Sequence, residues 1–119
     1  MTRIQETLNE LRRAAGVRGS ALLTPDGLMV AHTLDAQFRE DVVAGLTSFL
    51  LMTTHRCLRE NSMGSFQQFV LHATHGKAVF VELDTSYLVV LLDQFADLDS
   101  SRQEIQGAAQ RLRRCGKMS

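Results

Sequence analysis

Histidine and cysteine are the side chains of this sequence best suited to chemistry, because both ligate metals and take part in nucleophilic catalysis. The segment HATH, His72–His75, carries two histidines three residues apart. A zinc site needs two further ligands at fixed geometry, which His55 or Cys57 would have to supply from another segment. His55 and Cys57 lie two residues apart in a helical segment, so their side chains point about 200° apart and cannot form a catalytic pair. We therefore expect neither a metal site nor a nucleophile.

Glycine spacing, charge and aromatic content argue against phosphate and nucleic-acid ligands. Gly16 and Gly19 are not followed by the Lys-Ser/Thr pair of a phosphate-binding loop. Thirteen Lys and Arg balance thirteen Asp and Glu, whereas nucleic-acid binders depend on excess positive charge. Tyr87 is the only tyrosine and there is no tryptophan, so the chain offers no platform on which bases stack. We expect no enzyme activity, no cofactor and no nucleic-acid partner.

Cysteine usage and the distribution of apolar residues favour a cytoplasmic protein. Cys57 and Cys115 have neither metal-site spacing nor the density of a disulfide framework. The opening segment MTRIQETLNELRR is polar and amphipathic, unlike a signal peptide. No apolar run approaches the roughly 20 residues that a membrane span requires. We expect free thiols, a cytoplasmic location and no insertion into a membrane.

The first third of the chain predicts a helix followed by a hairpin. Apolar residues from Ile4 to Ala15 recur at helical spacing, and Gly16 is placed to cap the end of that helix. The residues TPDG that follow have the composition of a tight turn, in which Pro25 fixes φ and Gly27 accepts a positive φ. Two strands, over 16–24 and 28–33, are therefore expected on either side of this turn.

The remainder of the chain predicts a long helix, three strands and a last helix. Asp35 is a candidate N-cap for the long helix, and Ser101 with Glu104 forms a capping-box pattern before the last one. The expected elements are a helix over 38–60, strands over 66–73, 77–83 and 87–93, and a helix from 101 onward.

The strand YLVVLLD, Tyr87–Asp93, indicates the topology. It is apolar at successive positions and not at alternate ones, which is typical of a central strand covered on both faces. Short turns between neighbouring strands favour antiparallel pairing. We expect an α+β fold in which a five-stranded antiparallel sheet carries helices on both faces, in a single domain over residues 1–119.

The long helix carries two apolar stripes where a surface helix needs one. The broader stripe is expected to pack on the sheet and comprises Val42, Val43, Leu46, Phe49, Leu50 and Cys57. The second stripe combines leucines at seven-residue spacing with small residues, a pattern that favours a helix–helix contact. The terminal helix covers it in one alternative; in the other, which we prefer, a second copy does so in a homodimer. The predicted interface residues are Ala44, Thr47, Ser48, Leu51, His55 and Leu58.

The sequence resembles the roadblock family, which includes the dynein light chain roadblock and its bacterial relatives. Two segments carry the resemblance: GVRGSALLTPDGLMVA directly after an amphipathic helix, and KAVFVELDTSYLVVLLD, two apolar strands that meet at a short acidic turn. The resemblance implies a long helix on one face of the sheet and the N- and C-terminal helices on the other. It also implies a homodimer through the long helix and the strand that begins at Phe66. The segment FADLDSSRQEI departs from the glycine-containing turn of many bacterial members.

The resemblance implies a non-enzymatic role, because bacterial members bind Ras-like small GTPases and stimulate hydrolysis or exchange without hydrolysing GTP themselves. We therefore predict a homodimeric scaffold or regulator that binds a Ras-like small GTPase and modulates its nucleotide cycle. Arg56 and Arg59 are the candidate contacts with the GTPase. The alternative is a PAS-like small-molecule sensor, which needs a pocket between the sheet and the long helix. The side chains expected there, such as Leu46, Phe49 and Val81, look large enough to fill it.

Overall fold

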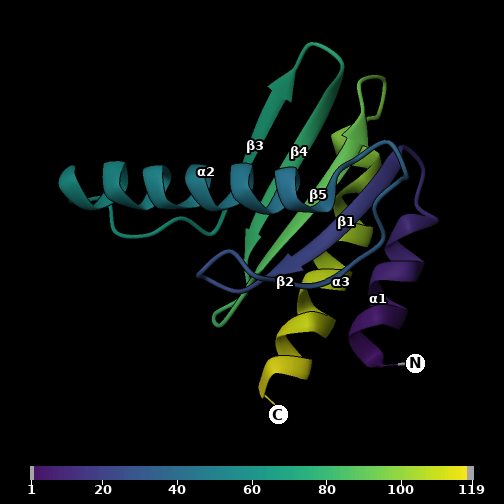
Figure 1. Cartoon of the computed structure of the whole chain (residues 1–119), viewed down its shortest axis with the longest axis horizontal. Coiled ribbons are helices and arrows are strands. Elements are labelled where there is room, and N and C mark those ends of the chain that lie inside the picture. Colours follow the sequence, from purple (N-terminus) through teal and green to yellow (C-terminus); the bar gives the residue numbers. More distant parts are fainter. Residues whose placement is uncertain (1, 118–119) are drawn as a thin grey trace.

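The computed structural model describes residues 2–117, in which a five-stranded antiparallel sheet separates one helix from two others (Figure 1). The strand order is β2-β1-β5-β4-β3, so β5 is central and β3 is an edge strand. The order of the elements and the fold class are those expected from the sequence. The elements are α1 (Arg3–Arg12), β1 (Val17–Leu23), β2 (Met29–His32), α2 (Glu40–Glu60), β3 (Gln68–Ala73), β4 (Gly76–Glu82), β5 (Tyr87–Asp93) and α3 (Leu98–Lys117).

Strand β5 contributes to hydrophobic cores on both faces of the sheet, as its uninterrupted apolar sequence predicts. Leu88, Val90 and Leu92 belong to the core on one face, whereas Val89 belongs to the core on the other. β5 pairs with β1 on one side and with β4 on the other, both antiparallel. Successive side chains of a strand point to opposite faces, so a central strand with two covered faces is apolar throughout.

The terminal helices α1 and α3 cover one face of the sheet. Leu8 and Leu11 of α1 meet Ile105, Ala109 and other residues of α3 in a single core that also holds buried side chains of three strands, β1, β4 and β5. The two helices are joined at the surface by an ion pair between Arg111 and Glu10, with a 2.7 Å N–O distance. This face therefore has a two-helix cover.

Helix α2 alone covers the opposite face, and its packing differs from the sequence-based expectation. The buried residues of α2 are Thr47 and Leu51, and Ala44 and Leu50 pack partly against the sheet core. The narrow stripe assigned to a second copy therefore faces the sheet. The broad stripe expected to pack on the sheet is largely exposed: Val42, Leu46, Phe49 and Cys57 point to solvent.

The β1–β2 turn adopts the conformation that its TPDG sequence predicts. The backbone N–H of Gly27 donates to the carbonyl of Thr24 at 2.9 Å, and Gly27 has φ of 93°. A Cβ at position 27 would lie 1.8 Å from Oγ of Ser48, so this glycine also allows the turn to approach α2.

Two of the expected helix boundaries are wrong at their N-termini. Asp35 does not cap α2; it forms ion pairs with Arg12 and Arg18, while Arg39 occupies the N-cap position without a side-chain hydrogen bond. The backbone N–H of Asp99, near the start of α3, donates to a carboxylate oxygen of Asp97 at 3.0 Å. The expected capping residue of α3, Ser101, is buried inside its first turns. Local capping patterns were outweighed here by tertiary ion pairs and packing.

Helix α1 also ends earlier than its apolar periodicity predicts. Its C-cap is Arg13, and Gly16 belongs to the turn into β1 with φ of 82°. A Cβ at Gly16 would lie 2.6 Å from Cβ of Ala96, so glycine is required for a close approach between chain segments. None of the helices within residues 2–117 combines the length and apolar character needed to cross a membrane.

Replacing Leu51 with alanine should lower the free energy of unfolding by about 2–5 kcal/mol, because a buried leucine loses both its transfer free energy and its filled volume. Urea denaturation followed by circular dichroism measures the change. The matched control is Met63→Ala, at a side chain that is 69% exposed just beyond α2, and it should cost less than about 0.5 kcal/mol. Equal losses in the two variants would contradict the packing face of α2 described above.

Candidate interaction surface

An apolar stripe runs along the solvent-facing side of α2. Val42, Leu46, Phe49 and Met52 follow one another at helical spacing and are 52%, 56%, 62% and 66% exposed. Single exposed apolar side chains are ordinary, but a contiguous group of four large ones on one helix indicates an interaction surface. We call these four residues the α2 stripe.

The α2 stripe adjoins a hollow that is lined in part by the edge strand β3. The hollow has a volume of about 620 Å³ and lies between the N-terminal part of α2 and the strand ends. Leu46 of the stripe and Leu71 of β3, itself 43% exposed, are among the residues that line it. Its wall is mainly apolar and is completed by Arg18, Gln37, Phe38, Ala73, Thr74, His75, Gly76, Lys77, Ala78, Leu91 and Leu92. The side chains expected to fill this space therefore leave it open, and Val81 belongs to the core on the other face.

Three of the seven residues predicted to form a dimer interface are buried within their own chain, and the other four are half-buried. Thr47 is 3%, Leu51 is 4% and Phe66 is 7% exposed. Ala44, Ser48, His55 and Leu58 are half-buried. Phe66 also precedes β3, which begins at Gln68, and does not lie within the edge strand. Side chains as buried as Leu51 are already covered by their own chain, so the exposed α2 stripe is the surface available to a partner.

His55 forms an anchor between the C-terminal half of α2 and the sheet. Its Nε2 is 2.8 Å from the hydroxyl oxygen of Tyr87, and its ring centroid is 4.8 Å from that of Phe66. Phe66 in turn stacks on Tyr87 and meets Phe69 edge-on. Burial raises the pKa of the Tyr87 phenol, and the negative charge of Glu82 raises it further. Sequence reasoning missed this cluster, because its members are separated by up to 32 residues.

The histidines and cysteines that were considered as metal ligands or as a catalytic pair do not come together in the structure. His72 is exposed on β3, and Nδ1 of His75 lies 3.3 Å from Oε1 of Gln94. Cys57 is exposed on α2 whereas His55 turns towards Tyr87. Within residues 2–117, no group of three or more His, Cys, Asp or Glu side chains is arranged to hold a metal ion.

Arg56 and Arg59 are both exposed near the C-terminal end of α2. Arg59 lies in the last turn of the helix, where a positive charge is favoured by the helix dipole. The two guanidinium groups therefore extend the accessible surface of α2 beyond Met52.

Comparison with known proteins places this fold in a family. A family model of the Roadblock/LC7 domain matches residues 3–92. The chain belongs to the Roadblock/LC7 family. A protein of Methanocaldococcus jannaschii, MJ1340, is 29% identical to it over 110 residues, which cover 92% of this chain and 96% of that protein.

Solved MglB structures have the same fold as this Roadblock/LC7 chain. MglB of Myxococcus xanthus superimposes with a TM-score of 0.92 at 16% identity, covering 100% of this chain and 98% of that one. An MglB with a tetrameric arrangement superimposes with a TM-score of 0.83 at 24% identity, covering 94% of this chain and 86% of that one. The Roadblock/LC7 architecture thus extends through α3, beyond the residues that the family model matches.

The phenol of Tyr87 in this Roadblock/LC7 protein should ionise above its ordinary pKa near 10. Because the chain holds one tyrosine and no tryptophan, tyrosinate absorbance during an alkaline titration reports Tyr87 alone. The unfolded chain ionises first, so stability should fall as pH rises above about 10 towards the folded pKa.

Tyr87→Phe should remove that part of the alkaline loss of stability while circular dichroism at neutral pH stays unchanged. An absorbance midpoint at or below the value of a tyrosine model peptide would contradict the packing of Tyr87 in the cluster.

Proposed function

We propose that this chain is a non-enzymatic homodimeric scaffold that binds a Ras-like small GTPase and modulates its nucleotide cycle. Membership of the Roadblock/LC7 family supports the general role. The observation that carries the proposal is the α2 stripe, which is exposed although it is as apolar as a core-facing surface. Burying side chains such as Leu46 and Phe49 against a partner contributes roughly 1.5–3 kcal/mol each.

A second copy of the chain is the partner that suits this surface. A two-fold contact is self-complementary, and a stripe centred on the middle of a long helix meets its own copy when the two helices cross near Leu46 and Phe49. In such a two-fold dimer, the exposed Leu71 on the β3 edge of each copy would turn towards the other copy. Side chains of one copy could then fill the open hollow of the other. A solved MglB with a tetrameric arrangement supports self-association within this fold.

The dimer would act on a GTPase by positioning. A rigid surface that binds one conformation of the GTPase switch loops more tightly than the other shifts their equilibrium and alters hydrolysis or exchange. Arg56 and Arg59 lie beyond the α2 stripe and stay accessible in such a dimer, so we propose them as contacts with the GTPase. Arginine suits this role because its guanidinium group pairs with carboxylates and phosphates in bidentate geometry.

Phe49→Glu should convert the dimer to a monomer, because two carboxylates would be brought together in an apolar contact. Sedimentation equilibrium measures the mass of the species in solution. Gln103→Glu adds the same charge to an exposed position of α3 and should leave the dimer intact. If Phe49→Glu and Gln103→Glu both sediment as dimers, the α2 stripe is ruled out as the interface.

GTPase binding is tested with the protein immobilised and a lysate of its source organism loaded with either a non-hydrolysable GTP analogue or GDP. We expect a small GTPase to be retained in one nucleotide state only. Arg56→Glu combined with Arg59→Glu should abolish retention while leaving the sedimentation mass unchanged. Retention of no GTPase in either state would remove the regulatory role and leave the dimer as a separate question.

The hollow beside β3 supports the sensor alternative more than the sequence suggested. Its volume of about 620 Å³ falls within the range of small-molecule sites, and its wall is mainly apolar. A defined small molecule recovered in stoichiometric amount with the purified protein would favour this second function over the first.

A further inference from the structure

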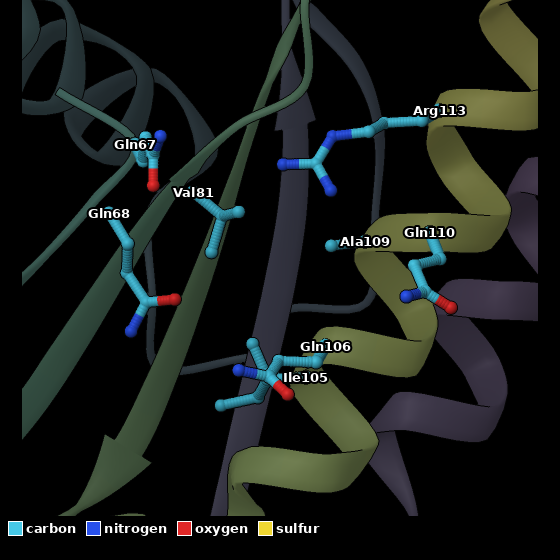
Figure 2. A pocket seen from close by; sticks show the side chains of 8 residues that line it. All are labelled: Gln67, Gln68, Val81, Ile105, Gln106, Ala109, Gln110 and Arg113. Carbon is cyan, nitrogen blue, oxygen red and sulfur yellow. The ribbon is translucent and has the colours of Figure 1, made fainter. Parts of the chain in front are cut away.

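The face of the sheet covered by α1 and α3 has a groove along its edge. Five strands about 4.8 Å apart make a sheet roughly 24 Å wide, whereas two helices about 10 Å across cover roughly 20 Å of it. The uncovered strip lies beside β3, where a cavity of about 360 Å³ separates the strands from α3 (Figure 2). It is lined by Gln67, Gln68, Val81, Ile105, Gln106, Ala109, Gln110 and Arg113.

A smaller cavity of about 90 Å³ continues this groove towards the start of α3. It shares Gln68, Ile105 and Gln106 with the first cavity and adds Arg102. The floor of the combined groove is formed by side chains such as Val79, Val81 and Ile105, which are at most 5% exposed. We call the two cavities together the α3 groove.

The helix wall of the α3 groove is a stripe of four long polar side chains: Arg102, Gln106, Gln110 and Arg113. They are spaced by four, four and three residues, so they lie on one side of α3 at intervals of about 6, 6 and 4.5 Å. In Figure 2, Gln106 and Arg113 extend from α3 towards the strands, Gln110 lies over the helix, and Gln67 and Gln68 come from the sheet side. The groove therefore has amides on both walls and a guanidinium group at each end.

The spacing of this stripe matches an extended polypeptide. An extended chain repeats every two residues, over about 6.6–6.8 Å, close to the interval between Gln106 and Gln110. A glutamine amide has both donor and acceptor groups, and can pair with the N–H and C=O that an extended segment leaves free. A helical segment has no such free groups outside its ends. The amides thus favour a strand over a helix as the occupant.

The charges at the two ends of the groove indicate acidic side chains in that segment. Arg102 and Arg113 are about 16.5 Å apart along the helix axis. Two side chains of an extended chain share a face only at an even separation; six residues span about 20 Å, and the long arginine and glutamate side chains cover the difference. No Asp or Glu is among the described residues that line either cavity. The side chain of Glu82 accepts from the backbone N–H of Asp84 and acts on Tyr87 of the other face.

Both arginines keep donors for a ligand. Arg102 pairs with Asp99 on its own helix at 3.1 Å, but the two side chains are 65% and 83% exposed, so this pair is weak and readily exchanged. Arg113 donates one N–H to the carbonyl of Glu82 at 2.7 Å, and its guanidinium has five N–H donors in all.

We propose that the α3 groove binds an extended polypeptide segment of a partner protein that carries two acidic residues six positions apart, on one face of the segment. The carboxylates pair with Arg102 and Arg113, and the backbone between them bonds to the glutamine amides. This site lies on the face of the sheet opposite the α2 stripe and does not require the GTPase proposal. Small-molecule sites are predominantly apolar, which disfavours a compact ligand in this polar groove.

The test uses fluorescence anisotropy with a labelled ten-residue peptide of threonine, glycine and valine that carries two glutamates six positions apart. We expect saturable binding that weakens as salt is added. The double variant Gln106→Ala, Gln110→Ala should lower the affinity by about tenfold through the lost hydrogen bonds. Gln103→Ala, at an exposed α3 position outside the groove, should not change it. Arg113 is left intact because its bond to Glu82 holds α3 on the sheet.

The acidic spacing is tested with Arg102→Gln and with peptides in which one or both glutamates are replaced by glutamine. Arg102→Gln should weaken the diglutamate peptide by about threefold and leave the diglutamine peptide unaffected. Absence of saturable binding at millimolar peptide, equal affinity in the Gln106/Gln110 and Gln103 variants, or tighter binding of a helix-stapled peptide would each overturn the proposal. Loss of self-association in the Gln106/Gln110 variant would overturn it in favour of a second copy.

Discussion

The structure depends on the burial of β5 between two hydrophobic layers. A strand that is apolar on both faces must have helices above and below it, and the rest of the fold supplies them. The two faces are covered unequally, because α1 and α3 both pack on one face and α2 is alone on the opposite face. Each unequal cover leaves a surface open to a partner: the α2 stripe on one side and the α3 groove beside β3 on the other.

The position of α2 is set by few contacts of different kinds. Thr47 and Leu51 hold the middle of the helix on the sheet, and the β1–β2 turn approaches it through Gly27. The His55–Tyr87 contact adds a directional link at the C-terminal half. Because these contacts involve only one narrow side of α2, the helix stays packed on the sheet while its bulkiest apolar residues face solvent. The sheet thus acts as a rigid base for a helix whose exposed side is free for recognition.

Sequence reasoning succeeds here where local chemistry determines the outcome. The composition of Tyr87–Asp93 predicts a central strand, and TPDG predicts the β1–β2 turn, because neither depends on distant residues. Sequence reasoning fails for α2, which carries two apolar stripes. Helical periodicity identifies both stripes, but it does not show which of them packs on the sheet. Asp35 has the right type and place for an N-cap, but Arg12 and Arg18, more than fifteen residues away, bind it instead. The α3 groove was missed for the same reason, because its walls come from segments brought together only by the topology.

The two edges of the sheet differ in a way that bears on how assembly stops. β3 is six residues long, whereas the opposite edge strand, β2, has four. If two copies pair through β3, the longer edges are consumed and the joined sheet ends on a β2 strand at either side. Edges this short are poor templates for further strands. The asymmetry between β2 and β3 would therefore make pairing self-limiting, giving a closed pair and not a growing fibre.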